Sequence, residues 1–192
     1  MAFRNSPQRW GWVAQFLHWS IALMIIGLVA VGLTMDDLPN SPDKIKLYAL
    51  HKSTGLTVLA LVVIRLIWRL VDPRPPYPPT IPAWQRKASD FTHGLLYVLM
   101  FAQPLSGWLY NSASNFPLRW FGLFSVPALS GPDKELKALA HELHEWGFYL
   151  LATLLLLHIA AAMKHHFVDR DATLARMTPG LPEPSAPNKE IA

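Results

Sequence analysis

The sequence predicts an all-α membrane protein built as a bundle of four transmembrane helices, and both its composition and its patterning support this prediction. Hydrophobic residues make up 52% of the 192 residues and charged residues 16%, whereas a soluble domain carries about 25% charged residues. Four long stretches are almost free of charge, and each approaches the roughly 20 residues that span a bilayer core. The absence of Cys excludes disulfides, Cys-ligated zinc or iron–sulfur sites, and covalently attached haem.

The four apolar stretches set the predicted helices. Residues 12–34 contain no Asp, Glu, Lys or Arg and predict the first helix, and residues 48–70 predict the second, with an apolar run that continues past Arg65. Residues 91–113 and 143–167 predict the third and fourth. The first stretch is too long for a signal-peptide core of roughly 7–15 residues, so we expect it to remain in the mature protein.

The connections complete one predicted domain over residues 1–177. Residues 71–82 are rich in Pro and predict a stiff loop rather than a helix. Residues 114–140 form the longest predicted loop, with a short surface helix near residues 134–139. Residues 178–192 hold four Pro among polar residues and predict a disordered tail.

The basic residues predict the orientation of the chain. They concentrate in the N-terminal arm, the second connection and the tail, whereas in the other two connections Lys and Arg are offset by Asp and Glu. Cytoplasmic segments of membrane proteins carry the excess of Lys and Arg, so both termini are predicted to be cytoplasmic. The positive net charge of +4 is therefore explained by topology, and we expect no nucleic-acid partner. The basic residues of the predicted cytoplasmic segments are Arg4, Arg9, Arg69, Arg74, Arg86, Lys87, Lys164, Arg170, Arg176 and Lys189.

Four histidines match in pairs by depth within the predicted helices. His18 lies about a quarter of the way in from the cytoplasmic face, and His51 lies near the outer end of the second helix. In the fourth helix His144 lies near the outer end and His158 near the inner end. These two are 14 residues apart, which places them about 21 Å apart and about 40° from alignment on one helix face. His51 therefore matches His144 at the outer level, and His18 matches His158 at the inner level.

Two stacked pairs of imidazoles predict two b-type haems, because haem b needs only axial ligands and a dry slot. Small residues one turn from the histidines predict such slots: Ala14, Ala22, Gly55, Ala140, Gly147 and Ala162. Zinc is less favoured because HELHE at residues 141–145 lacks the second His of a zinc-protease motif. A di-iron carboxylate site is excluded because the apolar spans carry no acidic residues.

Two assignments at these sites leave alternatives open. His141 lies one turn before His144 and is the other candidate outer ligand, but its 17-residue separation from His158 leaves the two about 100° apart. Arg65 follows His51 by 14 residues, at the depth of the inner pair. It is predicted to bind a haem propionate, and the alternative is a side chain that only reaches the membrane interface.

Several motifs carry a resemblance to a known family over residues 9–177. They are FLHWSIALM, LHKSTGL, RLIWRL, HGLLYVLMFAQPLSGW, HEWGFYLLATLLLLH, AAAMKHHF and TLARMTPG. In these motifs the chain resembles the bacterial cytochrome b561 family of four-helix, dihaem membrane cytochromes, which are related to the cytochrome b subunits of nickel hydrogenases. The resemblance implies that His18 and His158 hold one haem and that His51 and His144 hold the other.

The resemblance also implies an activity in the bacterial inner membrane. Similar family members are superoxide oxidases, which pass electrons from periplasmic superoxide to ubiquinone. By this resemblance a quinone would bind near the inner haem, around His93 and His165, with Arg86 and Lys87 nearby. At the outer haem Lys52, with Lys44 and Lys46 in the adjoining loop, would steer a small anion. The alternative is a non-enzymatic cytochrome b subunit that carries electrons between a partner dehydrogenase or hydrogenase, or another periplasmic redox protein, and the quinone pool.

Overall fold

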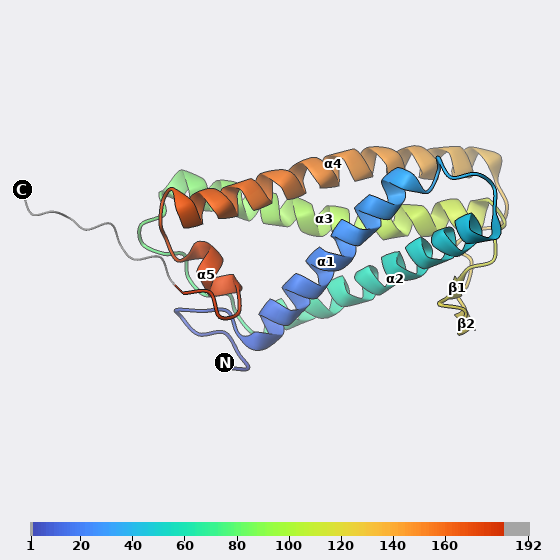
Figure 1. Ribbon diagram of the computed structural model, residues 1–192. Helices are drawn as coiled ribbons and strands as arrows, with labels where there is room; N and C mark the ends of the chain where they lie inside the picture. Colours follow the sequence, from blue (N-terminus) through green and yellow to red (C-terminus); the bar gives the residue numbers. More distant parts are fainter. Residues whose placement is uncertain (1, 183–192) are drawn as a thin grey trace, which may run out of the picture.

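The computed structural model describes residues 2–182, and in that range the chain forms four long helices, one short helix and one small hairpin (Figure 1). Residues 183–192, most of the predicted tail, lie outside the described residues. The elements are α1 (Trp12–Thr34), α2 (Pro42–Val71), α3 (Ala83–Ala113), β1 (Arg119–Trp120), β2 (Phe124–Ser125), α4 (Lys134–Phe167) and α5 (Thr173–Met177).

The first helix has the predicted bounds, but the other three long helices begin earlier than expected. The Ser41 hydroxyl caps α2 by accepting a hydrogen bond from the Lys44 amide at 3.2 Å, and Pro42 follows at the first helical position. The Asp133 carboxylate caps α4, so the surface helix predicted near residues 134–139 is the first part of α4. Hydropathy marks only the apolar part of a helix, and these polar first turns extend beyond it.

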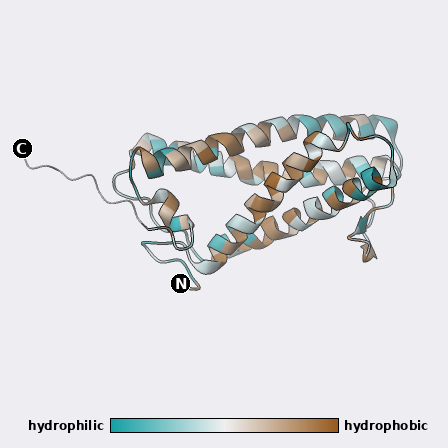
Figure 2. Cartoon of the chain, in the orientation of Figure 1, coloured by the Kyte–Doolittle hydropathy of each residue, from teal (hydrophilic) through white to brown (hydrophobic). Residues whose placement is uncertain are grey.

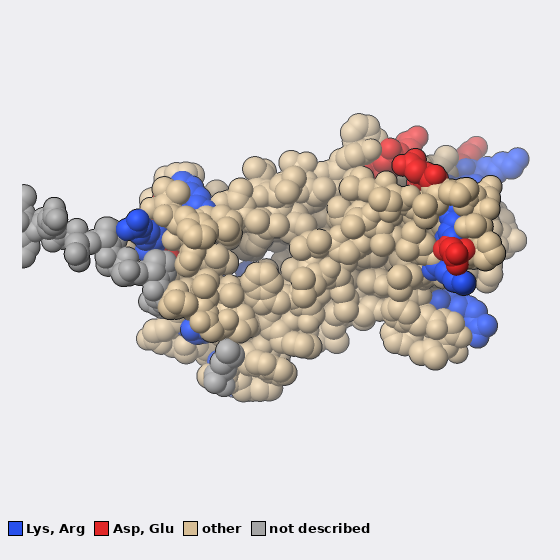
Figure 3. Space-filling model, viewed as in Figure 1, with Lys and Arg blue, Asp and Glu red and all other residues tan. Residues whose placement is uncertain are grey.

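The surface of the bundle fits a membrane protein. By length and composition α1, α2 and α4 are candidate membrane spans among the described residues. The middle of the bundle is apolar, and the charged side chains gather towards its two ends (Figures 2 and 3). The third long helix, α3, is as long as α2 but more polar, and it lies beside α4 and α2. A helix that faces other helices needs less apolar surface than one surrounded by lipid.

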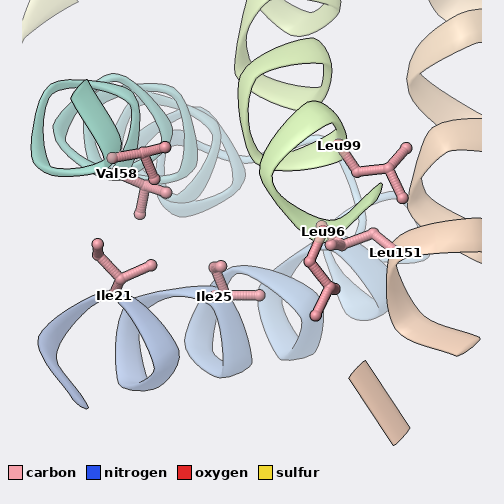
Figure 4. Packing of buried hydrophobic residues seen from close by; sticks show 7 residues of the cluster. Ile21, Ile25, Val58, Leu96, Leu99 and Leu151 are labelled. Carbon is pink, nitrogen blue, oxygen red and sulfur yellow. The ribbon is translucent and has the colours of Figure 1, made fainter. Parts of the chain in front are cut away.

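The helices pack in an uneven pattern that matters for the site. Packing is most extensive between α3 and α4, followed by α1 with α2 and α2 with α3, whereas α4 runs along neither α1 nor α2. The central core draws on all four long helices (Figure 4). Its buried members are Ile21, Ile25, Val58, Val62, Leu96, Leu99 and Leu151. This core lies between the outer and inner histidine levels and separates them.

The N-terminal arm and the segment around α5 lie together at one end of the bundle (Figure 1). The Trp10 amide donates to the Arg176 carbonyl at 3.2 Å, and the Trp19 indole donates to the Met177 carbonyl at 3.1 Å. Arg9 donates to the Thr178 carbonyl at 2.6 Å, so the first residue of the predicted tail is hydrogen-bonded. A chain whose two ends lie on one side of a membrane crosses it an even number of times.

Candidate functional site

The outer histidine pair joins α2 to α4. The ring centroids of His51 and His144 lie 6.4 Å apart, with the ring planes at 75°. His144 Nδ1 lies 2.9 Å from the Gln103 carbonyl oxygen and 3.2 Å from the Ser106 hydroxyl. A carbonyl oxygen can only accept a hydrogen bond, so the contact with Gln103 assigns the proton to Nδ1 of His144. Nε2 then has a free lone pair, which is the arrangement of a metal-binding histidine. The buried Nδ1 of His51 has no hydrogen-bond partner among the described residues.

The inner histidine pair joins α1 to α4. The ring centroids of His18 and His158 lie 6.2 Å apart, with the ring planes at 67°. His93, on α3, lies closer to His158, with ring centroids 5.2 Å apart. The inner level therefore holds three imidazoles, of which two pairs are candidates to enclose an iron atom.

The separation of the rings distinguishes these candidates. A metal–imidazole nitrogen bond of about 2.0 Å, plus about 1.1 Å from nitrogen to ring centre, places two rings on one iron about 6 Å apart. The pairs His51–His144 and His18–His158 fit this distance, and the 5.2 Å between His93 and His158 is too short. In addition, each fitting pair lies between helices that do not run along each other.

One glycine allows close approach at the outer level. A Cβ at Gly107 would lie 2.9 Å from His144 Cε1, closer than side chains pack, whereas a Cβ at Gly32 would make only an ordinary contact with His51 Cε1 at 3.6 Å. The predicted slot at Gly55 is open, with nothing within 4 Å of a Cβ placed there. At Gly147, by contrast, the Gln103 side chain fills the space, 2.5 Å from the Cβ position. Gly147 therefore serves packing between α3 and α4 rather than an open slot.

Arg65 lies at the inner level beside a small cavity. It is close enough to His18 and His158 to interact with both electrostatically, and its guanidinium carbon lies 5.9 Å from the ring centre of Tyr97. The cavity is lined by Asn5, Trp10, Ala14, Arg65, Trp68, Arg69, Asp72, Tyr97 and Met177. Arg65 and Arg69 both line this cavity, and two guanidinium groups suit an anionic group such as a haem propionate. The binding of a propionate by Arg65 stays a prediction.

Two of the four residues predicted near a quinone are histidines, and they lie in different surroundings. His93 Nδ1 lies 3.2 Å from the Ser89 hydroxyl, and its ring contacts His158. His165 Nδ1 lies 2.6 Å from an Asp171 carboxylate oxygen and 3.3 Å from Asp169. His93 thus belongs to the inner histidine level, and His165 belongs to an acidic cluster at the C-terminal end of α4.

The other two predicted quinone residues, Arg86 and Lys87, lie at the start of α3. Arg86 donates to the Ile81 carbonyl at 2.7 Å and so holds the Pro-rich connection, and Lys87 is exposed. In the same connection the hydrogen bond to Asp90 raises the pKa of Arg74. Arg86, His93 and His165 therefore have separate hydrogen-bond partners, and the quinone site stays a prediction.

The outer basic residues and the alternative ligand have other partners. His141 is exposed, and its ring contacts Tyr110 rather than His51. Lys52 donates to the Asn111 side chain at 3.0 Å. Lys44 is hydrogen-bonded to backbone carbonyls of its own loop, and Lys46 pairs with Asp43. Of these three lysines, Lys46 is the one whose charge is offset by an ion pair, whereas Lys44 and Lys52 bond to neutral acceptors and keep their positive charge.

Gln103 and Ser106 are site residues that were not predicted from the sequence. Both lie on α3 and contact His144, and the Gln103 side chain also donates to the His144 carbonyl at 2.8 Å. Two polar residues three apart in an uncharged span lie on one helix face. That spacing was a signal that this face of α3 is directed at a polar partner.

Comparison with known proteins agrees with this architecture. Residues 9–180 match the family model described as prokaryotic cytochrome b561. The chain is 36% identical over 178 residues to "Cytochrome b561 homolog 2" of Escherichia coli K12, covering 92% of this chain and 95% of that protein. It is 32% identical over 170 residues to "Cytochrome b561 homolog 1" of the same organism, covering 85% and 93%. It is 27% identical over 168 residues to "Probable superoxide oxidase CybB" of Yersinia pestis, covering 85% and 92%. The chain therefore belongs to the prokaryotic cytochrome b561 family, a family of membrane electron carriers with b-type haem.

Proposed function

We propose that this cytochrome carries single electrons across the bacterial inner membrane through two b haems, from superoxide at the outer face to ubiquinone at the cytoplasmic face. His51 and His144 would hold the outer haem, and His18 and His158 the inner one. A haem iron with two axial histidines exchanges one electron between its ferric and ferrous states. The observation that carries the proposal is the presence of two histidine pairs at the separation that one iron requires.

The surrounding residues support these roles. The Gln103 carbonyl and the Ser106 hydroxyl fix the ring of His144, and Arg65 supplies positive charge near the inner pair for a propionate. His93 and His165 would hydrogen-bond to the quinone and supply protons. Both described ends of the chain lie together, which favours an even number of crossings, here four. The excess of Lys and Arg in the same segments favours placing them, and both termini, in the cytoplasm.

The overall reaction balances with two substrate anions per quinone. Each superoxide loses one electron and becomes dioxygen. Ubiquinone gains two electrons and takes two protons from the cytoplasmic side to become ubiquinol. The chain therefore needs no nucleophile and no acid–base pair at its outer face, and it needs proton donors only at the inner level.

A second candidate is a subunit that passes electrons between a partner dehydrogenase and quinone without oxidising superoxide itself. The loop before α2 favours it, because Asp36, Asp37 and Asp43 outnumber Lys44 and Lys46 there and Lys46 pairs with Asp43, which leaves no excess positive charge in that loop to attract a small anion. In that case a periplasmic redox protein would dock at the outer face. The two candidates share the haem ligands and differ in the donor.

Direct mixing separates these two candidates. We expect superoxide to reduce the purified protein in milliseconds to seconds, and added ubiquinone to reoxidise it, as followed by the absorbance of reduced b haem. Superoxide dismutase, added as the control, should abolish the reduction. A protein that binds haem and is reduced by dithionite but not by superoxide would refute superoxide as the donor and favour the partner-subunit candidate.

A further inference from the structure

The hairpin formed by β1 and β2 is fixed to the membrane-spanning part of α2. The Phe121 amide donates to the Ser53 hydroxyl at 3.0 Å, and the Trp120 indole donates to the Thr57 hydroxyl at 3.0 Å. Counted back about 20 residues from the cytoplasmic end of the α2 span at Leu70, the hydrocarbon core begins near residue 50. Ser53 and Thr57 therefore lie about 5 and 10 Å inside the outer boundary of the hydrocarbon core, and they hold the hairpin at that depth.

The tip of this hairpin is apolar and exposed. Phe121 is 46% exposed, Leu123 71% and Phe124 55%. Between residues 115 and 132 the only charged residue is Arg119, which is exposed beside the tip. In the space-filling view an uncharged lobe projects sideways near the outer end of the bundle, and the hydropathy view shows the hairpin tip as apolar (Figures 2 and 3).

The backbone conformation at the tip is unusual for a residue as bulky as Phe121. Phe121 has φ of 45° and Gly122 has φ of 76°, the left-handed region in which hairpin turns prefer Asn–Gly. A bulky residue there is strained, and strained backbone clusters at functional sites. Two backbone hydrogen bonds pair polar atoms of the hairpin, from the Leu123 amide to the Trp120 carbonyl at 2.9 Å and from the Val126 amide to the Leu118 carbonyl at 2.8 Å, and burial in lipid favours such pairing.

From this geometry we infer that the β1–β2 hairpin is a membrane-interface anchor that inserts Phe121, Leu123 and Phe124 into the outer phospholipid leaflet. On α2, Ile64 lies seven residues after Thr57, on the same helix face, and is also exposed. Arg119 is placed to bind lipid phosphate, as basic residues do at a membrane interface. The anchor adds a fixed contact on the α2 side of the outer haem level, and it is independent of the proposed electron donor.

Spin labelling tests the anchor, because a chain without Cys gives one label per introduced cysteine. The variants are Leu123→Cys and Phe124→Cys, each labelled with a nitroxide and reconstituted in phosphatidylethanolamine–phosphatidylglycerol vesicles. The matched control is Leu129→Cys, an exposed leucine in the same connection. The Leu129 amide donates to the Ser112 hydroxyl at 3.1 Å. Ser112 lies about 7 Å further toward the outer end of α3 than Gly107, which packs against His144.

We expect labels at Leu123 and Phe124 to collide several-fold more with dioxygen, which dissolves in lipid, than with a water-soluble nickel chelate. The label at Leu129 should show the reverse. Preferential collision with the nickel chelate at Leu123 and Phe124 would overturn the inference, because it would place the tip in water. Poor access of both reagents to these two labels would overturn it as well, because another protein surface would then cover the tip.

Discussion

Replacing His144 with alanine removes the outer haem and leaves the inner haem in place. The imidazole of His144 is held by the Gln103 carbonyl and faces His51 at 6.4 Å between ring centroids, so no other described side chain replaces it on that iron. We expect about one haem per chain in place of two, since an axial ligand holds the iron of each b haem. The measurement is haem content by the pyridine haemochrome assay, together with the reduced-minus-oxidised spectrum.

Two further variants make this result specific. His51→Ala should have the same effect as His144→Ala, because each removes one side of the same pair. His141→Ala is the matched control, one turn away on the same helix and exposed, and it should keep both haems. Loss of haem in His141→Ala with retention in His144→Ala would assign the outer ligand to His141. Selective loss of the inner haem in His51→Ala would show the pairing to be wrong.

Replacing Arg176 with alanine is expected to destabilise the end of the bundle at which the N-terminal arm and α5 lie together. The Arg176 guanidinium donates to the carbonyls of Gln8, Pro76 and Pro7 at 2.7, 2.9 and 2.7 Å, and the residue is only 8% exposed. One side chain thus joins the N-terminal arm, the Pro-rich connection and α5. Because a hydrogen bond from a charged donor contributes about 1.5–3 kcal/mol, we expect a loss of about 2–4 kcal/mol in the free energy of unfolding.

This loss is measured by denaturant unfolding in detergent, with trypsin cleavage in the N-terminal arm as a second readout. Arg176→Lys should be nearly as harmful, since one ammonium group does not reproduce the three-way fork of a guanidinium. Arg4→Ala is the control: Arg4 is exposed, and its loss should change stability by no more than about 0.5 kcal/mol. Equal stability of Arg176→Ala and the unaltered chain would mean that the cytoplasmic segments are held in some other way.

The long helices and the histidine levels follow from the sequence because each depends on local pattern. A run without charge marks the part of a helix within lipid, and its length together with the Lys and Arg bias orders the crossings. Depth along oriented helices then brings His51 level with His144 and His18 level with His158, the same residues that lie 6.4 and 6.2 Å apart in the structure. The starts of α2, α3 and α4 lie before the predicted ones because polar first turns carry no hydropathy signal.

The features that escaped prediction depend on contacts between distant segments. Nothing local in the sequence states that Arg176 reaches the carbonyls of Gln8 and Pro76, or that the Trp120 indole reaches Thr57. The same limit applies to the predicted quinone residues. The family resemblance implies that Arg86 lies near a quinone, and in the structure its guanidinium donates to the Ile81 carbonyl of the Pro-rich connection. Long-range pairing of this kind is set by the folded topology rather than by residue type.

The proposed function depends on two histidine pairs that hold two b haems in one chain. The most direct measurement is the haem-to-protein ratio of the purified full-length chain, read from the reduced-minus-oxidised spectrum and the pyridine haemochrome assay. The pairs at 6.2 and 6.4 Å predict two haems per chain, both with the low-spin spectrum of an iron held by two imidazoles. A ratio of one, a ratio of zero, or a high-spin centre at either level would contradict the claim.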